Sequence, residues 1–138
     1  MIILDTNVLS ELAKPKPEPG VIAWLDSFPA NELATTAVTA AELWFGIGLL
    51  PDGRRKSELA HAVDDMLNDD LHVHAFDVAA AVRYADLVAE RTRAGRPITM
   101  ADAQIAAICF SHGATLATRN TRDFLDAGIA LVNPWEQD

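Results

Sequence analysis

The sequence predicts an α/β fold, an α/β/α sandwich in which helices cover both faces of a parallel β-sheet. Short apolar runs typical of strands alternate with longer segments whose apolar residues recur at helical spacing. No two strand-like runs are joined by a two-residue hairpin signal, so the strands are expected to run parallel. With 138 residues, the chain is long enough for one domain with a real core, and we expect a single domain over residues 1–138.

The first half of the chain is expected to form two strands and four helices. The buried run "IIL" predicts the first strand, and Thr6 is a suitable N-cap for the helix that follows. Three prolines in "KPKPEPG" (14–20) end that helix, and Pro51-Asp52-Gly53 ends a later one. The expected strands are 2–4 and 32–38, and the expected helices are 6–13, 20–28, 39–50 and 54–68.

The second half repeats the alternation. Asp77 is the expected N-cap of a long helix, and Gly113 the expected C-cap of the next one. His72 and His74 lie on one side of a strand with no third zinc ligand in reach, so we expect surface or half-buried histidines. The expected strands are 72–76, 114–118 and 129–132, and the expected helices are 78–95 and 99–113.

Composition limits the classes of function. No apolar run approaches the roughly 20 residues that span a bilayer, and the start lacks a basic signal-peptide region, so a cytoplasmic location is expected and no membrane contact. The net charge of −9 argues against holding nucleic acid by general electrostatics. It leaves room for local binding through metal ions and a few arginines. Cys109 is alone and is expected to be a small buried hydrophobe.

Four acidic residues stand where a site is expected. Asp5 directly follows the buried run 2–4, where a carboxylate is costly unless something offsets it. In parallel α/β folds the site lies at the carboxyl ends of the strands. Glu42 and Asp123 are expected to start helices at that same edge, whereas Asp102 follows another helix and its placement rests less on pattern.

Helix capping is the alternative explanation for three of these acids. Each follows a capping residue by three positions, the spacing of a capping box: Thr39 with Glu42, Thr99 with Asp102, and Asn120 with Asp123. A cap is worth about 1 kcal/mol. If the acids converge, each pair at about 4 Å costs about 4 kcal/mol at an effective dielectric of 20, which caps do not offset. A divalent cation does, and carboxylates are ligands that Mg²⁺ and Mn²⁺ prefer.

Four segments in order resemble one known family. "IILDTNVLSEL", "TAAELWFGI", "TMADAQIAAIC" and "LATRNTRDF" resemble PIN domains, most closely the VapC-type toxins of bacterial toxin–antitoxin pairs, and the closing "NPW" resembles the FitB-like branch. The resemblance runs from residue 1 to about residue 135. It implies a ribonuclease that depends on Mg²⁺ or Mn²⁺, a homodimer, and a small cognate VapB-type antitoxin through which alone DNA would be contacted.

The resemblance also assigns roles to residues. Asp5, Glu42 and Asp102 would hold the metal, with Asp123 as the fourth catalytic acid. Some relatives carry an acid at the position of Asn120 instead, so the fourth position stays open between these two residues. Apart from the resemblance, Thr6 and Thr118 are expected at strand ends, where they would bond a water or phosphate oxygen, or serve only as helix cap and strand residue. Arg119 would meet a phosphate, or lie in a solvated loop.

Two other classes of function also use a parallel α/β fold. A phospho-acceptor receiver domain needs a lysine late in the chain, and the lysines here are Lys14, Lys16 and Lys56, which excludes it. A non-catalytic PIN-fold partner in a DNA-binding regulatory complex stays open. For the antitoxin, we expect an amphipathic helix with an arginine tip that enters the acidic site. Its groove would be formed by Leu9, Leu12, Trp44 and Leu50.

Overall fold

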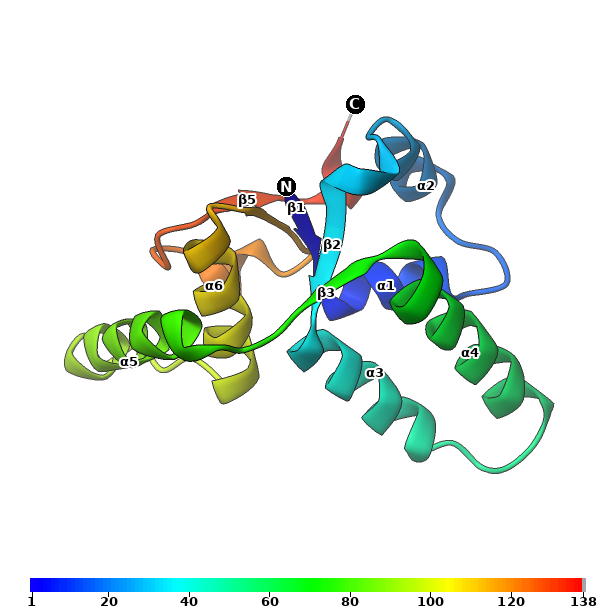
Figure 1. Ribbon diagram of the computed structural model, residues 1–138, viewed down its shortest axis with the longest axis horizontal. Coiled ribbons are helices and arrows are strands. Elements are labelled where there is room, and N and C mark those ends of the chain that lie inside the picture. Colours follow the sequence, from blue (N-terminus) through cyan, green and yellow to red (C-terminus); the bar gives the residue numbers. More distant parts are fainter. Residues whose placement is uncertain (138) are drawn as a thin grey trace.

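The computed structural model describes residues 1–137 and contains a five-stranded parallel sheet (Figure 1). Its strands are β1 (Ile2–Leu4), β2 (Leu33–Thr36), β3 (His72–His74), β4 (Thr115–Ala117) and β5 (Ala130–Val132). Their order across the sheet is β3-β2-β1-β4-β5, and every pairing is parallel. The predicted parallel sheet is confirmed, with β1 at its centre.

Six α-helices flank the sheet. They are α1 (Thr6–Leu12), α2 (Pro19–Asp26), α3 (Ala37–Gly48), α4 (Arg54–Asp65), α5 (Val78–Arg93) and α6 (Met100–His112). In Figure 1, α5 and α6 lie on one side of the sheet, and α1, α3 and α4 lie on the other. Within the described part of the chain, no helix is long and apolar enough to cross a membrane.

The side chains of β1 alternate between two hydrophobic clusters. Ile3 packs in the cluster that contains α5 and α6, whereas Leu4 packs in the one that contains α1, α2, α3 and α4. Leu116 and Ala117 of β4 divide between the same two clusters. This alternation is what a strand buried on both faces requires, because successive side chains point to opposite sides.

Two predicted helix starts are wrong. Asp5, not Thr6, is the N-cap of α1, and its carboxylate accepts the backbone N–H of Thr6 at 2.8 Å. Thr36, not Thr39, caps α3: its hydroxyl accepts the N–H of Thr39 at 3.1 Å, so the helix begins at Ala37. The capping box between Thr39 and Glu42, the alternative explanation for this acid, is therefore absent.

Other local predictions are confirmed. Asp77 caps α5 by accepting the N–H of Ala80 at 3.0 Å, and Thr99 caps α6 by accepting the N–H of Asp102 at 3.2 Å. Gly113 ends α6 with φ +60°, a left-handed conformation that favours glycine. Cys109 is fully buried, and burial raises the pKa of its thiol to about 12.

Three histidines come together beside β3, which the sequence did not suggest. His74 ends β3 and is buried, and its ring centroid lies 4.5 Å from that of His72 and 4.0 Å from that of His112 at the end of α6. Its Nε2 atom has no hydrogen-bond partner among the described residues. The expectation of surface or half-buried histidines is therefore wrong for His74, because α6 covers it.

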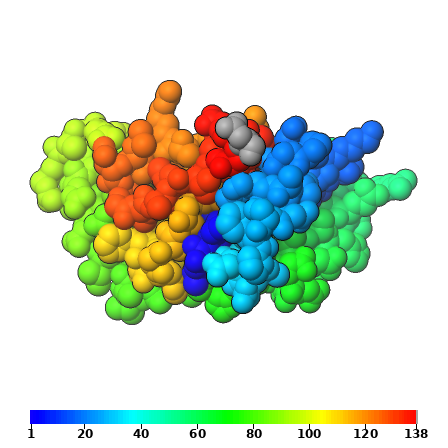
Figure 2. Space-filling view, turned by 90° about the horizontal axis from the view of Figure 1, so that it is seen from above, coloured from blue at the N-terminus to red at the C-terminus, as the bar shows by residue number. Residues whose placement is uncertain are grey.

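The two ends of the sheet differ in what they present. Figure 2 looks at the end where the strands begin, and there the first residues of the chain (dark blue) lie between the segments that start β2 (cyan) and β4 (gold). The carboxyl ends of the strands lie at the other end. There Asp5, Thr36 and Thr118 follow or end strands and are all buried.

Candidate active site

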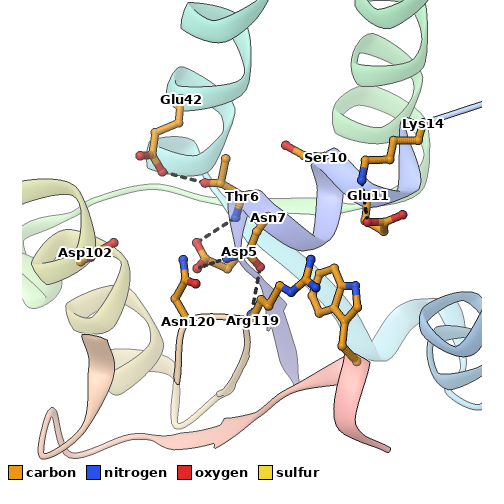
Figure 3. Close-up of a pocket in the computed structure, with 11 residues that line it drawn as sticks. Asp5, Thr6, Asn7, Ser10, Glu11, Lys14, Glu42, Asp102, Arg119 and Asn120 are labelled. Carbon is orange, nitrogen blue, oxygen red and sulfur yellow. Dashed lines mark hydrogen bonds and ion pairs between the residues drawn. The ribbon is translucent and has the colours of Figure 1, made fainter. Parts of the chain in front are cut away.

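A polar cavity of about 460 Å³ opens beside the carboxyl end of β1. Figure 3 shows its walls: α1 supplies residues on one side, α3 and α6 contribute one acid each, and the loop after β4 completes it. It is lined by Asp5, Thr6, Asn7, Ser10, Glu11, Lys14, Glu42, Asp102, Arg119, Asn120 and Trp135. Three of the four acids singled out in the sequence thus share one cavity.

Asp5 lies at the centre of this site and is only 5% exposed. Its backbone N–H donates to the carbonyl of Ala117 at 3.0 Å, which holds it as an extension of the central strand. One carboxylate oxygen accepts the Thr6 N–H, and the other accepts the Thr118 hydroxyl at 2.7 Å. These bonds fix the direction of the carboxylate before anything binds.

Thr118 is the residue that joins the two central strands at the site. Its buried hydroxyl donates to Asp5 and accepts the N–H of Asn120 at 3.1 Å and the Nδ2 of Asn7 at 3.2 Å. The Oδ1 of Asn7 accepts the N–H of Arg119 at 3.0 Å, which anchors the loop to α1. Thr118 therefore lies behind the cavity and positions Asp5.

Glu42 lies on α3, facing α1 across the cavity (Figure 3). Its Oε1 accepts the hydroxyl of Thr6 at 2.6 Å, and that hydroxyl also lies 3.3 Å from the Thr39 hydroxyl. Thr6 thus touches both neighbouring acids, with its amide on Asp5 and its hydroxyl on Glu42. This dual contact follows from its place in the first turn of α1.

The remaining acids lie on the other side. Asp102 is in the first turn of α6, a helix that is largely buried behind it, and its side chain lines the cavity. Of the two candidates for the fourth position, Asn120 lines the cavity. Asp123 lies in the short 3₁₀ helix Thr121–Phe124, where it is exposed and does not line the cavity.

The four acids influence one another through their charges, as the pKa values of Asp5 and Asp102 show. Burial raises the pKa of Asp5 above its ordinary value, hydrogen bonds from Thr118 and Thr6 oppose the rise, and the charges of Glu42 and Asp123 add to it. Burial also raises the pKa of Asp102, with a smaller contribution from the charge of Asp5. Both carboxylates therefore ionise less readily than free aspartate, as expected where like charges gather.

The donor set suits a hard cation. Carboxylate and amide oxygens from Asp5, Glu42, Asp102 and Asn120 are the ligand types that Mg²⁺ and Mn²⁺ prefer. No three His, Cys, Asp or Glu side chains within residues 1–137 are already close enough to enclose a metal ion. The Oε1 of Glu42 instead accepts the hydroxyl of Thr6 at 2.6 Å.

Several lining residues were missed in the sequence. Glu11 is buried in α1 and bonds Lys14 Nζ at 3.0 Å and the N–H of Glu18 at 3.0 Å. The Lys14 hydrogen bond lowers the pKa of Glu11, so this acid is neutralised within the chain, unlike Asp5. No local signal could have revealed Asn7, because its side chain bonds the Thr118 hydroxyl and the N–H of Arg119, which lie 111 and 112 positions away. Trp135 carried none.

An apolar groove of about 550 Å³ adjoins the cavity. The two share a wall made of Thr6, Ser10, Lys14 and Glu42. Its larger apolar side chains are Leu43 and Ile47 of α3, Leu50 just after that helix, and Leu59 and Val63 of α4. Of the four residues expected to form a groove, only Leu50 lines it; Leu9 is fully buried core, and Leu12 and Trp44 lie outside the lining.

Residues 2–129 of the chain match the family described as PIN domain. The chain belongs to the PIN domain family. This match covers β1 to β4 and ends just before β5, so it includes all four acids. The resemblance read from the four sequence segments is confirmed, and so is the α/β/α arrangement that it implied.

Within this PIN family, the chain is similar to named toxins. It is 41% identical over 138 residues to VapC ribonuclease Y4jK of Sinorhizobium fredii, covering 99% of each chain. It is 38% identical over 137 residues to toxin FitB of Neisseria gonorrhoeae, covering 98% of this chain and 99% of that one. Among solved structures, that of FitAB bound to an IR36 DNA fragment contains a chain with TM-score 0.90 and 36% identity, covering 100% of this chain and 98% of that one.

Proposed function

We propose that this PIN protein is a metal-dependent ribonuclease and the toxin of a type II toxin–antitoxin pair. One observation carries the proposal: the carboxylates of Asp5, Glu42 and Asp102, from three separate elements, line one cavity. Capping accounts for Asp5 alone, which caps α1; Glu42 caps nothing, and the caps of α3 and α6 are threonines. Its similarity to a relative named as a ribonuclease adds support.

Mg²⁺ or Mn²⁺ would be held by Asp5, Glu42 and Asp102, with Asn120 or Asp123 at the fourth position. When bound, the cation lowers the pKa of a water, orients the phosphodiester and neutralises developing charge. The chain's own residues supply the preorganisation. Thr118 and Thr6 fix the Asp5 carboxylate, and the buried helix α6 gives Asp102 a rigid support.

The apolar groove is the proposed seat of a VapB-type antitoxin. It adjoins the acidic cavity along a shared wall, so a helix lying in the groove would place its end at the carboxylates. An arginine there would meet the acids and oppose metal binding. DNA would be contacted only through this partner, in keeping with the net charge of −9 and with the relative solved as FitAB on DNA.

A homodimer is part of the same proposal. Large apolar side chains are exposed on α3 and α5, namely Phe45 (69% exposed), Leu49 (71%), Val78 (81%) and Val82 (62%). Exposed apolar side chains that gather into one patch are typical of a protein interface, and the proposal places the subunit contact on these two helices. We also propose a cytoplasmic location, where RNA is the available substrate.

A non-catalytic role in a DNA-binding complex is the second candidate. The observation that favours it is the relative's structure, FitAB bound to a DNA fragment. The two candidates differ in what the carboxylates do. A scaffold has no need of a carboxylate-dependent metal site, whereas the nuclease requires one.

The experiment measures both properties on the purified chain. Manganese binding is followed by calorimetry, and cleavage of a single-stranded RNA is followed with Mg²⁺, with Mn²⁺ and with chelator. We expect metal-dependent cleavage and manganese binding that Glu42→Gln weakens at least tenfold. Asp86→Asn, an exposed acid on α5, is the matched control and should match the unsubstituted protein. Manganese binding equal in both variants would contradict the nuclease proposal.

A further inference from the structure

The loop after β4 brings a positive charge into the acidic cavity. Arg119 lines the cavity with Asp5 and Glu42, and its backbone is anchored to α1 through Asn7. In a chain of net charge −9, an arginine beside carboxylates would be expected to pair with one. Among residues 1–137, Arg119 forms no ion pair. Its positive charge makes only a small contribution to the lowered pKa of Glu11.

The guanidinium of Arg119 lies instead on an aromatic ring. Its Cζ is 4.9 Å from the ring centroid of Trp135, a residue that also lines the cavity. The backbone at Trp135 is itself held in place. The backbone N–H of Trp135 donates to Asn133 Oδ1 at 2.9 Å, and the neighbouring Pro134 is buried. The ring face attracts the cation but leaves its charge and its N–H donors free for a ligand.

Other arginines of the chain are used differently. The guanidinium of Arg83 donates to the carbonyl of Ala127, and that of Arg91 donates to the carbonyl of Leu125. Arg96 pairs with Asp126. These three stabilise the loop between β4 and β5. Arg119 differs from them in that its guanidinium is exposed at a cavity and its described contact is a ring face.

We propose that Arg119 binds a phosphate of the RNA substrate next to the scissile one, and that Trp135 is the residue that positions its guanidinium for this. This inference rests on the proposed ribonuclease function and states which residues hold the RNA strand. The acids repel a polyanion, so a strand entering the cavity needs a cationic contact that the acids have not neutralised. Stacking on Trp135 keeps the guanidinium at the rim instead of letting it collapse onto Asp5 or Glu42, and its planar fork matches a phosphate.

The test uses the full chain and a short fluorescent single-stranded RNA. Arg119→Gln should raise KM about tenfold and change kcat less than threefold, because a binding contact is lost and the acids are untouched. Trp135→Leu should raise KM by a smaller factor, and Trp135→Phe should recover most of it. Arg93→Gln, the same charge change at an exposed site on α5, is the control and should leave both constants unchanged.

Anisotropy provides a readout that does not depend on cleavage. In an Asp102→Asn background with Mn²⁺ omitted, Arg119→Gln should make the slope of log K against log salt shallower by about 0.7, the value of one lost contact to a single strand. The inference is overturned if Arg119→Gln equals Arg93→Gln in KM and slope, or if it lowers kcat alone. Such results would leave the ribonuclease proposal standing, since that fails only if the unsubstituted chain does not cleave RNA.

Discussion

The acids around Asp5 and the histidines around His74 each include one buried group at the end of a strand, and burial shifts the pKa of these two groups in opposite directions. It raises the pKa of Asp5, and it lowers the pKa of His74, where the charges of His112 and His72 add to the effect and that of Asp77 opposes it. In each case the low dielectric of the interior disfavours the charged form.

The two clusters differ in what surrounds the buried group. Asp5 accepts bonds from Thr6 and Thr118, so its charged form is supported by donors aimed at it. The Nε2 of His74 has no partner among the described residues. Preorganised donors around a group that is costly to bury indicate a group kept for its charge, whereas a histidine without partners is explained by packing. The acids around Asp5 are therefore the cluster to test for catalytic chemistry.

The largest expected effect separates the clusters by activity. Asp102→Asn and His112→Gln change the first turn and the last residue of the same helix, α6. The first should lower RNA cleavage by about 10²–10³-fold, the loss typical of one preorganised charge at a reacting centre. The second should stay within about twofold, since no described contact joins His112 to the cavity. Cleavage rates of the two variants are measured at the same metal concentration. A comparable loss of rate in both would contradict the assignment of the active site to the acids.

Stability should show the value of the donors around Asp5. Thr118→Val removes the hydroxyl at 2.7 Å and should lower the free energy of unfolding by about 1–3 kcal/mol at neutral pH, because a buried carboxylate loses its partner. Thr35→Val is the control: this buried hydroxyl donates to the neutral Leu4 carbonyl at 2.8 Å, and its loss should cost about 0.5–1.5 kcal/mol. Denaturant unfolding measures both, and a Thr118→Val loss no larger than the control would contradict the prediction.

The histidine cluster should behave in the opposite way. His74→Phe replaces an unpartnered buried nitrogen with an apolar ring, so the free energy of unfolding should stay constant or rise by about 1 kcal/mol. His61→Phe at an exposed position of α4 should give no gain. A loss above about 1 kcal/mol in His74→Phe would show that His74 has a polar role.

The smallest effect is a pair of opposed pH dependences in chelator. Asp5 has a raised pKa, so its contribution to stability is full below its ordinary value of 3.8 and is lost as the pH rises through the folded value. His74 has a lowered pKa, so its contribution is full above 6.5 and is lost as the pH falls. Between pH 3.8 and pH 6.5, the Asp5 contribution to stability therefore falls as the pH rises, whereas the His74 contribution increases.

Single variants should expose each slope. Relative to the unsubstituted protein, the stability of Asp5→Asn should increase with pH over this window, and that of His74→Phe should decrease, each by less than about 1.4 kcal/mol per pH unit. Taking differences removes groups common to all three proteins. Parallel profiles would show that burial does not shift these two groups.

Much of the fold was predictable because its signals are local. Apolar runs give the strands, and Asp77, Thr99 and Gly113 mark helix ends through bonds within a few residues. The start of α3 was misplaced because Thr36 and Thr39 are both able to cap, and the strand that ends at Thr36 decides between them.

The site was predictable only in part. Asp5 could be placed because the end of a parallel strand is a fixed position in the fold. The roles of Asn7 and Trp135, and the meeting of His74 with His112, depend on contacts between distant segments, which no spacing in the sequence encodes. For the same reason the fourth position was left open: Asn120 lines the cavity, while Asp123 acts on it only through its charge.

The bond from Thr118 to Asp5 also has a consequence for biosynthesis. It joins residues 113 positions apart, so at about 5–20 residues per second Thr118 is made roughly 6 to 23 s after Asp5. Until β4 inserts beside β1, the aspartate has no hydroxyl to orient it and Arg119 has no place beside it. On the proposed function, the chain is an inert nuclease until β4 has been made and has paired with β1, and a partner that needs the finished cavity binds only after that step.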